Sequence, residues 1–227
     1  MATFYAPDLT TSSTVFQLDE EESKHCVRVL RKNIGDSIFL VNGKGLFFDT
    51  VISDNHPKRC VVSVQKVEFH QPTSPIHIAV APTKNMDRME WFLEKATELG
   101  LTKLSFFVSK NSERNQVKLD RLEKIAISAM KQSQRFYLPE IEFISDFRKL
   151  IEMYPVGYIA HCMEDQSKLS LKDIEANKTI IIGPEGDFTK DEVEFSFSNG
   201  YKPISLGEFR LRTETAALLA VVKGHFN

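Results

Sequence analysis

The sequence predicts an α/β protein built from a small β-rich N-terminal part and a larger C-terminal α/β domain. Residues 1–70 hold short apolar runs separated by turn residues, a pattern typical of a small β-barrel. In residues 76–227 strand and helix patterns alternate, which favours a mostly parallel sheet. Between them, residues 71–75 are polar and proline-containing, as expected of a linker. The 227 residues contain enough apolar side chains for a sizeable core.

The N-terminal part is expected to contain one helix, over residues 20–31. Cys26, Val27 and Leu30 recur at helical spacing and are predicted to form its inner face. Strands are expected at residues 37–41, 46–52 and 59–64, with Asn42-Gly43 as the hairpin turn between the first two.

The C-terminal domain is expected to begin with a strand at 76–80, followed by a helix over 86–99 that ends at Gly100. Further strands are predicted at 104–108, 158–161 and 179–182, and further helices at 120–134 and 193–199. The inner face of the helix over 86–99 is predicted to consist of Met89, Phe92, Leu93 and Ala96.

Two glycine-bearing bends stand out in the last fifty residues. Gly183-Pro-Glu-Gly186 follows the strand ending at Ile182, and a Thr-x-x-Glu capping box at 189–192 then opens a helix. A second short strand ends at Leu206-Gly207 and leads to the helix-forming run 216–220. Because ligands bind at the carboxyl ends of parallel strands, the two bends predict a ligand site.

Composition and motifs exclude several classes of protein. Neither bend has the pattern of a phosphate loop or of a dinucleotide-binding loop. Cys26, Cys60 and Cys162 are sparse and lack Cys-x-x-Cys spacing, which argues against a disulfide scaffold and against a zinc site, so no metal is expected. No signal peptide and no membrane span are indicated, so a cytoplasmic protein is expected. The net charge of −2 does not by itself indicate a polyanionic partner.

The motif Gly183-Pro-Glu-Gly186, followed by Leu206-Gly-x-x-x-Leu-Arg-Thr-Glu-Thr-Ala216, resembles the signature of the RsmE-type methyltransferases. The resemblance implies S-adenosylmethionine-dependent methylation of uracil N3 in 16S, small-subunit ribosomal RNA, on naked RNA or on the assembling small ribosomal subunit. It also implies a PUA-like RNA-binding barrel, a SPOUT domain with a trefoil knot, and a homodimer. Other segments in the family's order are Ala6-Pro7, residues 25–31 with Gly35-Asp36, Lys95-Ala-Thr-Glu-Leu-Gly100, Gln132-Ser133 and Arg135.

The chain departs from the family pattern in two places. Asp187 stands where the family often has a second glycine, and Glu208-Phe209 stands where proline and arginine are common. Arg210 is a candidate to replace the missing charge.

The chemistry requires a uracil N3 anion, and an arginine with paired donors can stabilise that charge. Arg212 is the first candidate, and an ion pair with Glu214 or Glu185 that only stiffens the loop is the alternative. Glu185 or Glu214 could accept the proton, although Glu214 could equally be a favourable charge in the first turn of its helix. The resemblance implies that the donor contacts His161, Ile182, Gly183, Pro184, Gly186, Leu206, Gly207, Leu211 and Thr213.

Basic residues cluster in two places, around residues 24–32 and over 103–135. On the predicted helix 120–134 they share one face, which is either a solvated flank or a surface for the phosphate backbone. The rival interpretations of function are a catalytically silent RNA-binding protein and a methyltransferase acting on another RNA position, such as a ribose hydroxyl. The candidate RNA contacts are Arg28, Arg31, Lys110, Arg114, Arg121, Lys124, Lys131 and Arg135.

Overall fold

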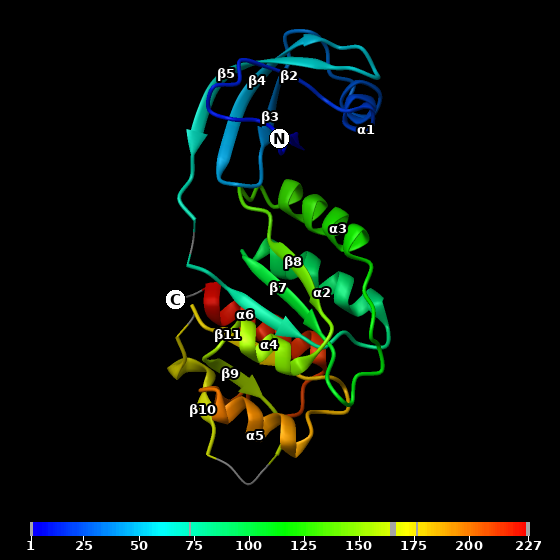
Figure 1. Cartoon of the computed structure of the whole chain (residues 1–227). Helices are drawn as coiled ribbons and strands as arrows, with labels where there is room; N and C mark the ends of the chain where they lie inside the picture. The colour runs from blue at the N-terminus through cyan, green and yellow to red at the C-terminus, as the bar shows by residue number, and fades with distance from the viewer. Residues whose placement is uncertain (1, 73, 164–166, 176, 226–227) are drawn as a thin grey trace. The chain divides into compact units, whose positions relative to one another are not determined.

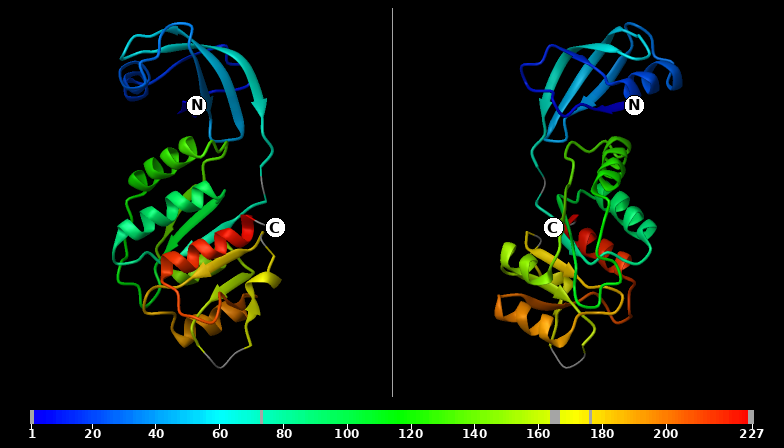
Figure 2. Two further views of the ribbon diagram at one scale, coloured as in Figure 1. Left: turned by 180° about the vertical axis from the view of Figure 1, so that it is seen from behind. Right: turned by 45° about the vertical axis from the view of Figure 1, so that its right-hand side comes forward.

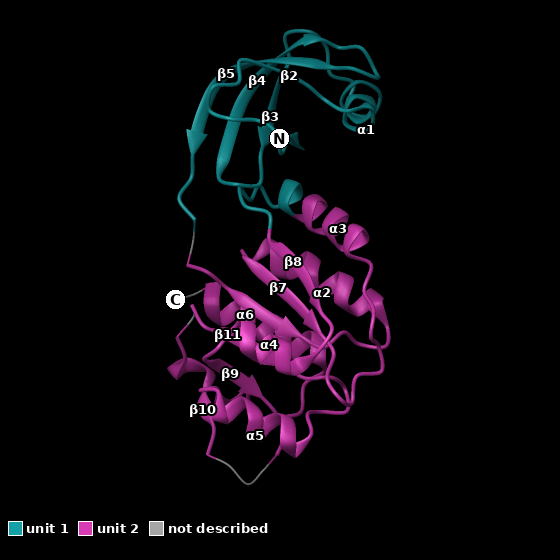
Figure 3. Cartoon of the chain, in the orientation of Figure 1, with its two compact units in different colours: residues 1–72, 130–138 teal, residues 73–129, 139–227 magenta. Residues whose placement is uncertain are grey.

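The computed structural model describes residues 2–72, 74–163, 167–175 and 177–225 (Figure 1). The chain divides into two compact units (Figure 3). Unit 1 comprises Met1–Pro72 and Met130–Leu138, and unit 2 comprises Thr73–Ala129 and Pro139–Asn227. The assignment of 1–70 and 76–227 as domains joined by a linker at 71–75 stays a prediction.

Unit 1 is built on a five-stranded sheet in the order β1-β3-β4-β5-β2. β1 runs parallel to β3, and the remaining neighbours are antiparallel. Two register shifts interrupt the β4–β5 ladder, which locally increases the twist of the sheet. The strands are β1 (Thr3–Tyr5), β2 (Val15–Gln17), β3 (Ser37–Val41), β4 (Leu46–Asp54) and β5 (Val61–Phe69). Sequence analysis missed β1 and β2, which are only three residues long.

The helix expected over 20–31 is shorter and changes type. α1 spans Glu20–Lys24, with Asp19 as its N-cap, and a π-helical turn, η1 (His25–Val29), follows. Because a π-helical turn is wider than an α-helical one, side chains after it leave the expected face. Leu30 is accordingly 38% exposed, so its predicted place on the inner face is wrong.

Cys26 does lie on the inner face of this segment, and the fold brings its thiol into hydrogen-bonding contact with that of Cys60. Both cysteines are free thiols. Burial, followed by the neighbouring Cys60, raises the pKa of Cys26 to about 12, so this thiol stays protonated at neutral pH.

The segment 130–138 completes unit 1 by packing against the β3–β4 hairpin. The Gly45 amide donates to the Phe136 carbonyl at 3.0 Å, and the Leu138 amide donates to the Gly43 carbonyl at 3.0 Å. The Phe136 ring stacks on His70 with the ring centroids 3.6 Å apart.

Unit 2 is organised around a seven-stranded sheet, entirely parallel, in the order β10-β12-β9-β11-β6-β7-β8. Figure 2 shows α2 and α6 on one face of this sheet and α4 and α5 on the other. The strands are β6 (His77–Val80), β7 (Lys103–Phe107), β8 (Glu140–Ile144), β9 (Gly157–Ala160), β10 (Leu169–Ser170), β11 (Thr179–Ile182) and β12 (Lys202–Ser205). The helices are α2 (Met86–Glu98), α3 (Leu119–Gln132, which ends in unit 1), α4 (Phe147–Met153), η2 (Leu171–Asp173), α5 (Lys190–Ser198) and α6 (Thr213–His225).

The mostly parallel α/β sheet predicted for the C-terminal part is confirmed, and β11 has the predicted bounds. The expected inner face of α2 is buried, and α5 carries the predicted capping box. Sequence analysis missed β8, α4 and β10. The trefoil knot stays a prediction, and none of the described helices is long and apolar enough to cross a membrane.

A chain of polar side chains crosses four strands of this sheet. The His77 ring lies between the hydroxyls of Thr179 and Ser105, at 2.9 Å from Nδ1 and 2.7 Å from Nε2. The Ser105 hydroxyl donates to Glu142 at 2.6 Å, and the Tyr154 hydroxyl donates to the same carboxylate oxygen at 2.7 Å. Burial lowers the pKa of His77 from 6.5 to about 4, so the ring is neutral at physiological pH.

Candidate functional site

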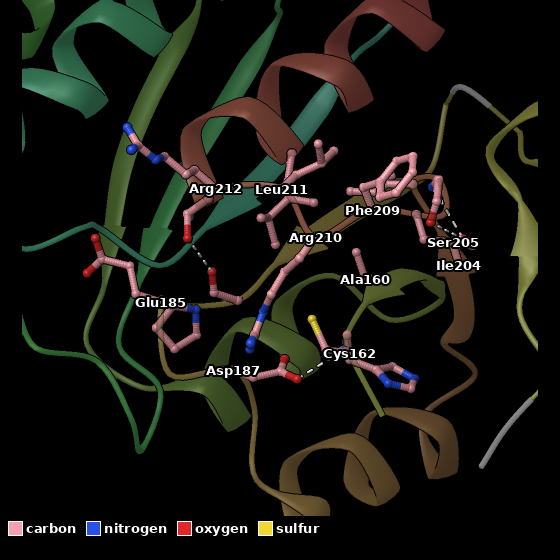
Figure 4. Close-up of a pocket in the computed structure, with 18 of the residues that line it drawn as sticks. Ala160, Cys162, Glu185, Asp187, Ile204, Ser205, Phe209, Arg210, Leu211 and Arg212 are labelled. Atoms are coloured by element: carbon pink, nitrogen blue, oxygen red, sulfur yellow. Dashed lines mark hydrogen bonds between the residues drawn. The ribbon is translucent and has the colours of Figure 1, made fainter. Parts of the chain in front are cut away.

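A cavity of about 750 Å³ opens at the carboxyl ends of β9, β11 and β12 (Figure 4). Three loops form it, and each begins where one of these parallel strands ends, which is the usual position of a ligand site in such a sheet. Among the residues predicted to contact a ligand, the cavity is lined by His161, Ile182, Gly183, Pro184, Leu206, Gly207, Leu211 and Thr213, but not by Gly186.

The loop after β11 is a tight turn held by its own backbone. The Asp187 amide donates to the Pro184 carbonyl at 3.0 Å, and Phe188 folds back over Gly183. A Cβ on Gly183 would lie 2.7 Å from the Phe188 ring, so the absence of a side chain permits this packing. The Thr213 hydroxyl donates to the Gly183 carbonyl at 3.4 Å and links the two glycine-bearing bends.

Asp187 connects the loops after β9 and β11. Its backbone is left-handed, with φ of +61°, a conformation that glycine adopts freely and that aspartate tolerates better than most residues. One carboxylate oxygen accepts the Cys162 amide and the other accepts the Phe188 amide, both at 2.9 Å. The Asn111 amide group donates to the Asp187 carbonyl at 2.9 Å.

The loop after β12 is exposed from Gly207 to Arg212. Gly207 has φ of +133°, and a Cβ there would meet nothing within 4 Å, so the backbone angle rather than space requires glycine. Phe209 is 84% exposed.

Arg88, from the first turn of α2, also lines the cavity and was missed by sequence analysis. Its guanidinium lies 3.5 Å from Glu185 and 3.8 Å from Glu214, so one cation contacts both motifs. Glu214 is only 7% exposed, and its Oε2 has no hydrogen-bond partner among the described residues. The β6–β11 pairing brings α2 to this site, and no sequence motif marks that pairing.

Arg212 lies at the edge of the cavity and is exposed. No ion pair joins it to a described residue, and the predicted alternative partners Glu185 and Glu214 contact Arg88 instead. In Figure 4 Arg210 points across the cavity toward Asp187, whereas Arg212 extends toward the side where Glu185 lies.

Several candidate RNA contacts are engaged within the protein. Arg121 pairs with Glu90 at 2.6 Å, and Lys131 pairs with Glu22. Arg114 donates to the Lys84 carbonyl at 2.7 Å. Their role in RNA binding stays a prediction, as does that of the exposed Arg28, Arg31, Lys110 and Lys124 and of the half-buried Arg135.

The cavity suits a ligand of mixed character and ordinary metabolite size. Ile182, Leu206 and Leu211 supply apolar surface for a heterocycle, and the ends of three strands supply backbone donors and acceptors. Carboxylates and guanidinium groups stand at the same edge. No group of three His, Cys, Asp or Glu side chains in the described part of the chain is placed to hold a metal ion. S-adenosylmethionine, which combines an adenine, hydroxyls and charged groups, fits this set of residues.

Comparison with known families defines the class of protein. The model of the RNA methyltransferase domain matches residues 70–223, and that of the RNA methyltransferase PUA domain matches residues 18–65. The chain is thus an RNA methyltransferase with an N-terminal PUA domain.

More specific relatives narrow this class. The ribosomal RNA small subunit methyltransferase E of Rickettsia conorii is 33% identical over 229 residues, which cover 96% of this chain and 93% of the relative. The chain belongs to the family of ribosomal RNA small subunit methyltransferase E.

Solved structures of this class share the fold along the whole chain. The crystal structure of a probable rRNA-methyltransferase from Porphyromonas gingivalis has a TM-score of 0.88 and 40% identity, covering 100% of both chains. A ribosomal RNA small subunit methyltransferase E from Neisseria gonorrhoeae, bound to S-adenosyl methionine, has a TM-score of 0.84 and 28% identity, covering 97% of this chain and 95% of that chain.

Proposed function

We propose that this protein transfers a methyl group from S-adenosylmethionine to N3 of a uridine in small-subunit ribosomal RNA. The observation that carries the proposal is the convergence of three strand-end loops on one cavity, with Arg212 at its edge. Membership in the family supports the same reaction. The Neisseria relative with S-adenosyl methionine bound supports the choice of donor.

The residues that would hold the donor are those of the three loops. Ile182, Leu206 and Leu211 provide apolar contact, and Gly183 and Gly207 also line the cavity. The donor supplies an electrophilic methyl group on a sulfonium, so the protein's tasks are orientation and the control of charge.

The target nitrogen must lose its proton before it can attack, because uracil N3 is protonated at neutral pH. Arg212 has a planar set of donors that suits the two carbonyl oxygens flanking N3, on which the negative charge is shared. Its guanidinium forms no ion pair with a described residue, so it is available for this role.

Glu185 is the better candidate to accept the N3 proton. It lines the cavity, whereas Glu214 does not. Arg88 contacts both carboxylates and thereby fixes the bend after β11 against the start of α6. Glu214 then has a structural role, as the buried anchor of Arg88.

The RNA is bound through the basic residues and the PUA domain, and the protein acts as a cytoplasmic homodimer.

The final helix, α6, packs within its own subunit. Its four most buried nonpolar residues face the protein's own core, where α6 packs on α2, β6 and β11. These residues are Ala216, Ala217, Ala220 and Val221. Burial of this helix therefore needs no second copy, and the homodimer rests on the family resemblance alone.

Mass spectrometry of small-subunit ribosomal RNA from a deletion strain, with and without the complementing gene, tests the proposed reaction. The proposal predicts a uridine that gains a base methyl group only in the complemented strain. A ribose methyl group, or no difference between the strains, would overturn it.

The role of Arg212 has its own test. Arg212→Ala is expected to abolish turnover while the dissociation constant of S-adenosylmethionine, measured by calorimetry, stays within about threefold of wild type. Loss of donor binding with normal chemistry would show that Arg212 holds the donor and does not stabilise the uracil anion.

A further inference from the structure

Asp187 is a carboxylate in the cavity wall that is not neutralised by an ion pair. Among the residues that the structure describes, no cation lies within ion-pairing distance of it, and its carboxylate oxygens accept hydrogen bonds from the backbone amides of Cys162 and Phe188. A carboxylate can accept about four hydrogen bonds, so part of its capacity and all of its charge remain available to a ligand.

The backbone fixes where this charge lies. Asp187 stands in a left-handed conformation, and hydrogen bonds hold its amide, its carbonyl and both side-chain oxygens. Because backbone amides hold both of its oxygens, the side chain cannot easily turn away from the cavity, and the carboxylate stays in the wall.

Arg210 introduces an opposing charge on the same cavity. It lines the cavity from the exposed loop after β12, and Figure 4 shows its side chain pointing toward Asp187 without forming an ion pair. A cationic ligand between the two loops would therefore be attracted by Asp187 and repelled by Arg210.

We propose that Asp187 and Arg210 set the preference of this cavity for a cationic donor over its neutral product. This inference rests on the proposed function. Methyl transfer moves the methyl group from the sulfonium to the N3 anion, and the N3 proton has passed to the accepting carboxylate. S-adenosylmethionine thus becomes S-adenosylhomocysteine, which lacks the methyl group and the positive charge on sulfur. Asp187 favours binding of the cationic donor, so the product is released more readily than the donor. Arg210 repels the donor and limits this difference.

Calorimetric titration of both ligands into the full chain tests this proposal. The measured quantity is the preference ratio, defined as the dissociation constant of S-adenosylhomocysteine divided by that of S-adenosylmethionine. Asp187→Asn is expected to lower the ratio roughly three- to tenfold, the range for unit charges about 6 Å apart in a medium between water and protein interior. Arg210→Gln is expected to raise the ratio.

The variants are chosen to separate charge from structure. Asparagine tolerates a left-handed backbone and keeps one of the two side-chain acceptors, so Asp187→Asn removes the charge and one of the two hydrogen bonds from the Cys162 and Phe188 amides. Arg210 lies on an exposed loop, so its variant does not endanger the fold. Asp191→Asn is the matched control, because it removes one exposed acid in the first turn of α5 that does not line this cavity.

Each result bears on the proposal. An unchanged ratio in both the Asp187 and Arg210 variants, with wild type binding both ligands, would overturn the inference and leave the proposed function intact. An equal change in Asp191→Asn would also overturn it, because net charge would then explain the effect. If wild-type protein bound neither ligand, the proposed function would fail along with the inference.

Discussion

Acidic pH should lower the free energy of unfolding of the α/β unit, because unfolding lets the buried His77 ring take up a proton. The ring lies between Thr179 and Ser105 in the polar chain that joins β11, β6, β7 and β8. Burial is the largest cause of its low pKa and the Lys103 ammonium is the second, while the Glu142 carboxylate acts in the opposite direction. Because the Ser105 hydroxyl donates to Glu142, Nε2 donates to Ser105 and Nδ1 accepts from Thr179. Protonation would place a hydrogen on Nδ1 and remove that acceptor.

The size of the effect follows from the two pKa values of His77. The pKa is 6.5 in the unfolded chain and about 4 in the fold, so between these pH values only the unfolded state takes up the proton. The free energy of unfolding therefore falls by about 1.4 kcal/mol for each pH unit below 6.5 and stops falling near pH 4. The total loss is about 3 kcal/mol.

Urea denaturation of wild type and His77→Gln at pH 7.5, 6.0 and 5.0 measures this loss. Glutamine keeps one donor and one acceptor but does not titrate, so the variant should lose about 2 kcal/mol less than wild type between pH 7.5 and 5.0. His56→Gln, which removes a histidine from unit 1, is the control and should behave as wild type. Parallel pH profiles for wild type and His77→Gln would refute the reasoning.

Three further outcomes are expected at the cavity. Gly207→Ala should raise the dissociation constant of S-adenosylmethionine about tenfold with little change in melting temperature, because a Cβ strains this backbone angle by about 1–2 kcal/mol; unchanged affinity would show that the angle is not needed for binding. Arg88→Gln should destabilise the protein by about 1–2 kcal/mol, since buried Glu214 loses its cation, and Arg88→Lys should restore part of the loss; equal stabilities in a urea titration would argue against the bridge. Ellman's reagent at pH 8 should modify exposed Cys162 and spare buried Cys26, whose pKa is about 12, and S-adenosylmethionine should slow the reaction at Cys162; rapid labelling of Cys26 in the native protein would contradict its burial.

Much of the fold was accessible from local sequence signals. β11 and the capping box of α5 were predicted to the residue, because three isoleucines and a Thr-x-x-Glu pattern are strong local signals. β8 and α4 were missed because their apolar positions are interrupted by charged residues, one of which, Glu142, is held across the sheet by Ser105. The π-helical turn of η1 has no sequence signature, so the exposure of Leu30 was not foreseeable.

The candidate site was accessible only in part. The two glycine-bearing bends were recognised because each follows a strand and precedes a helix. Arg88 was not recognised as a site residue, because its contact with Glu185 and Glu214 depends on β6 pairing with β11 across roughly a hundred residues of sequence. The packing role of Gly183 was not accessible either, because it depends on the Phe188 ring folding back over this glycine.

A crystal structure of the protein grown with S-adenosylmethionine would test most directly whether the three strand-end loops form the donor site. We expect density for the donor in contact with Gly183 and the 206–213 loop, with the Arg212 guanidinium at the open side of the methyl group. Density for the donor elsewhere on the protein, with this cavity filled only by water, would contradict the proposed site.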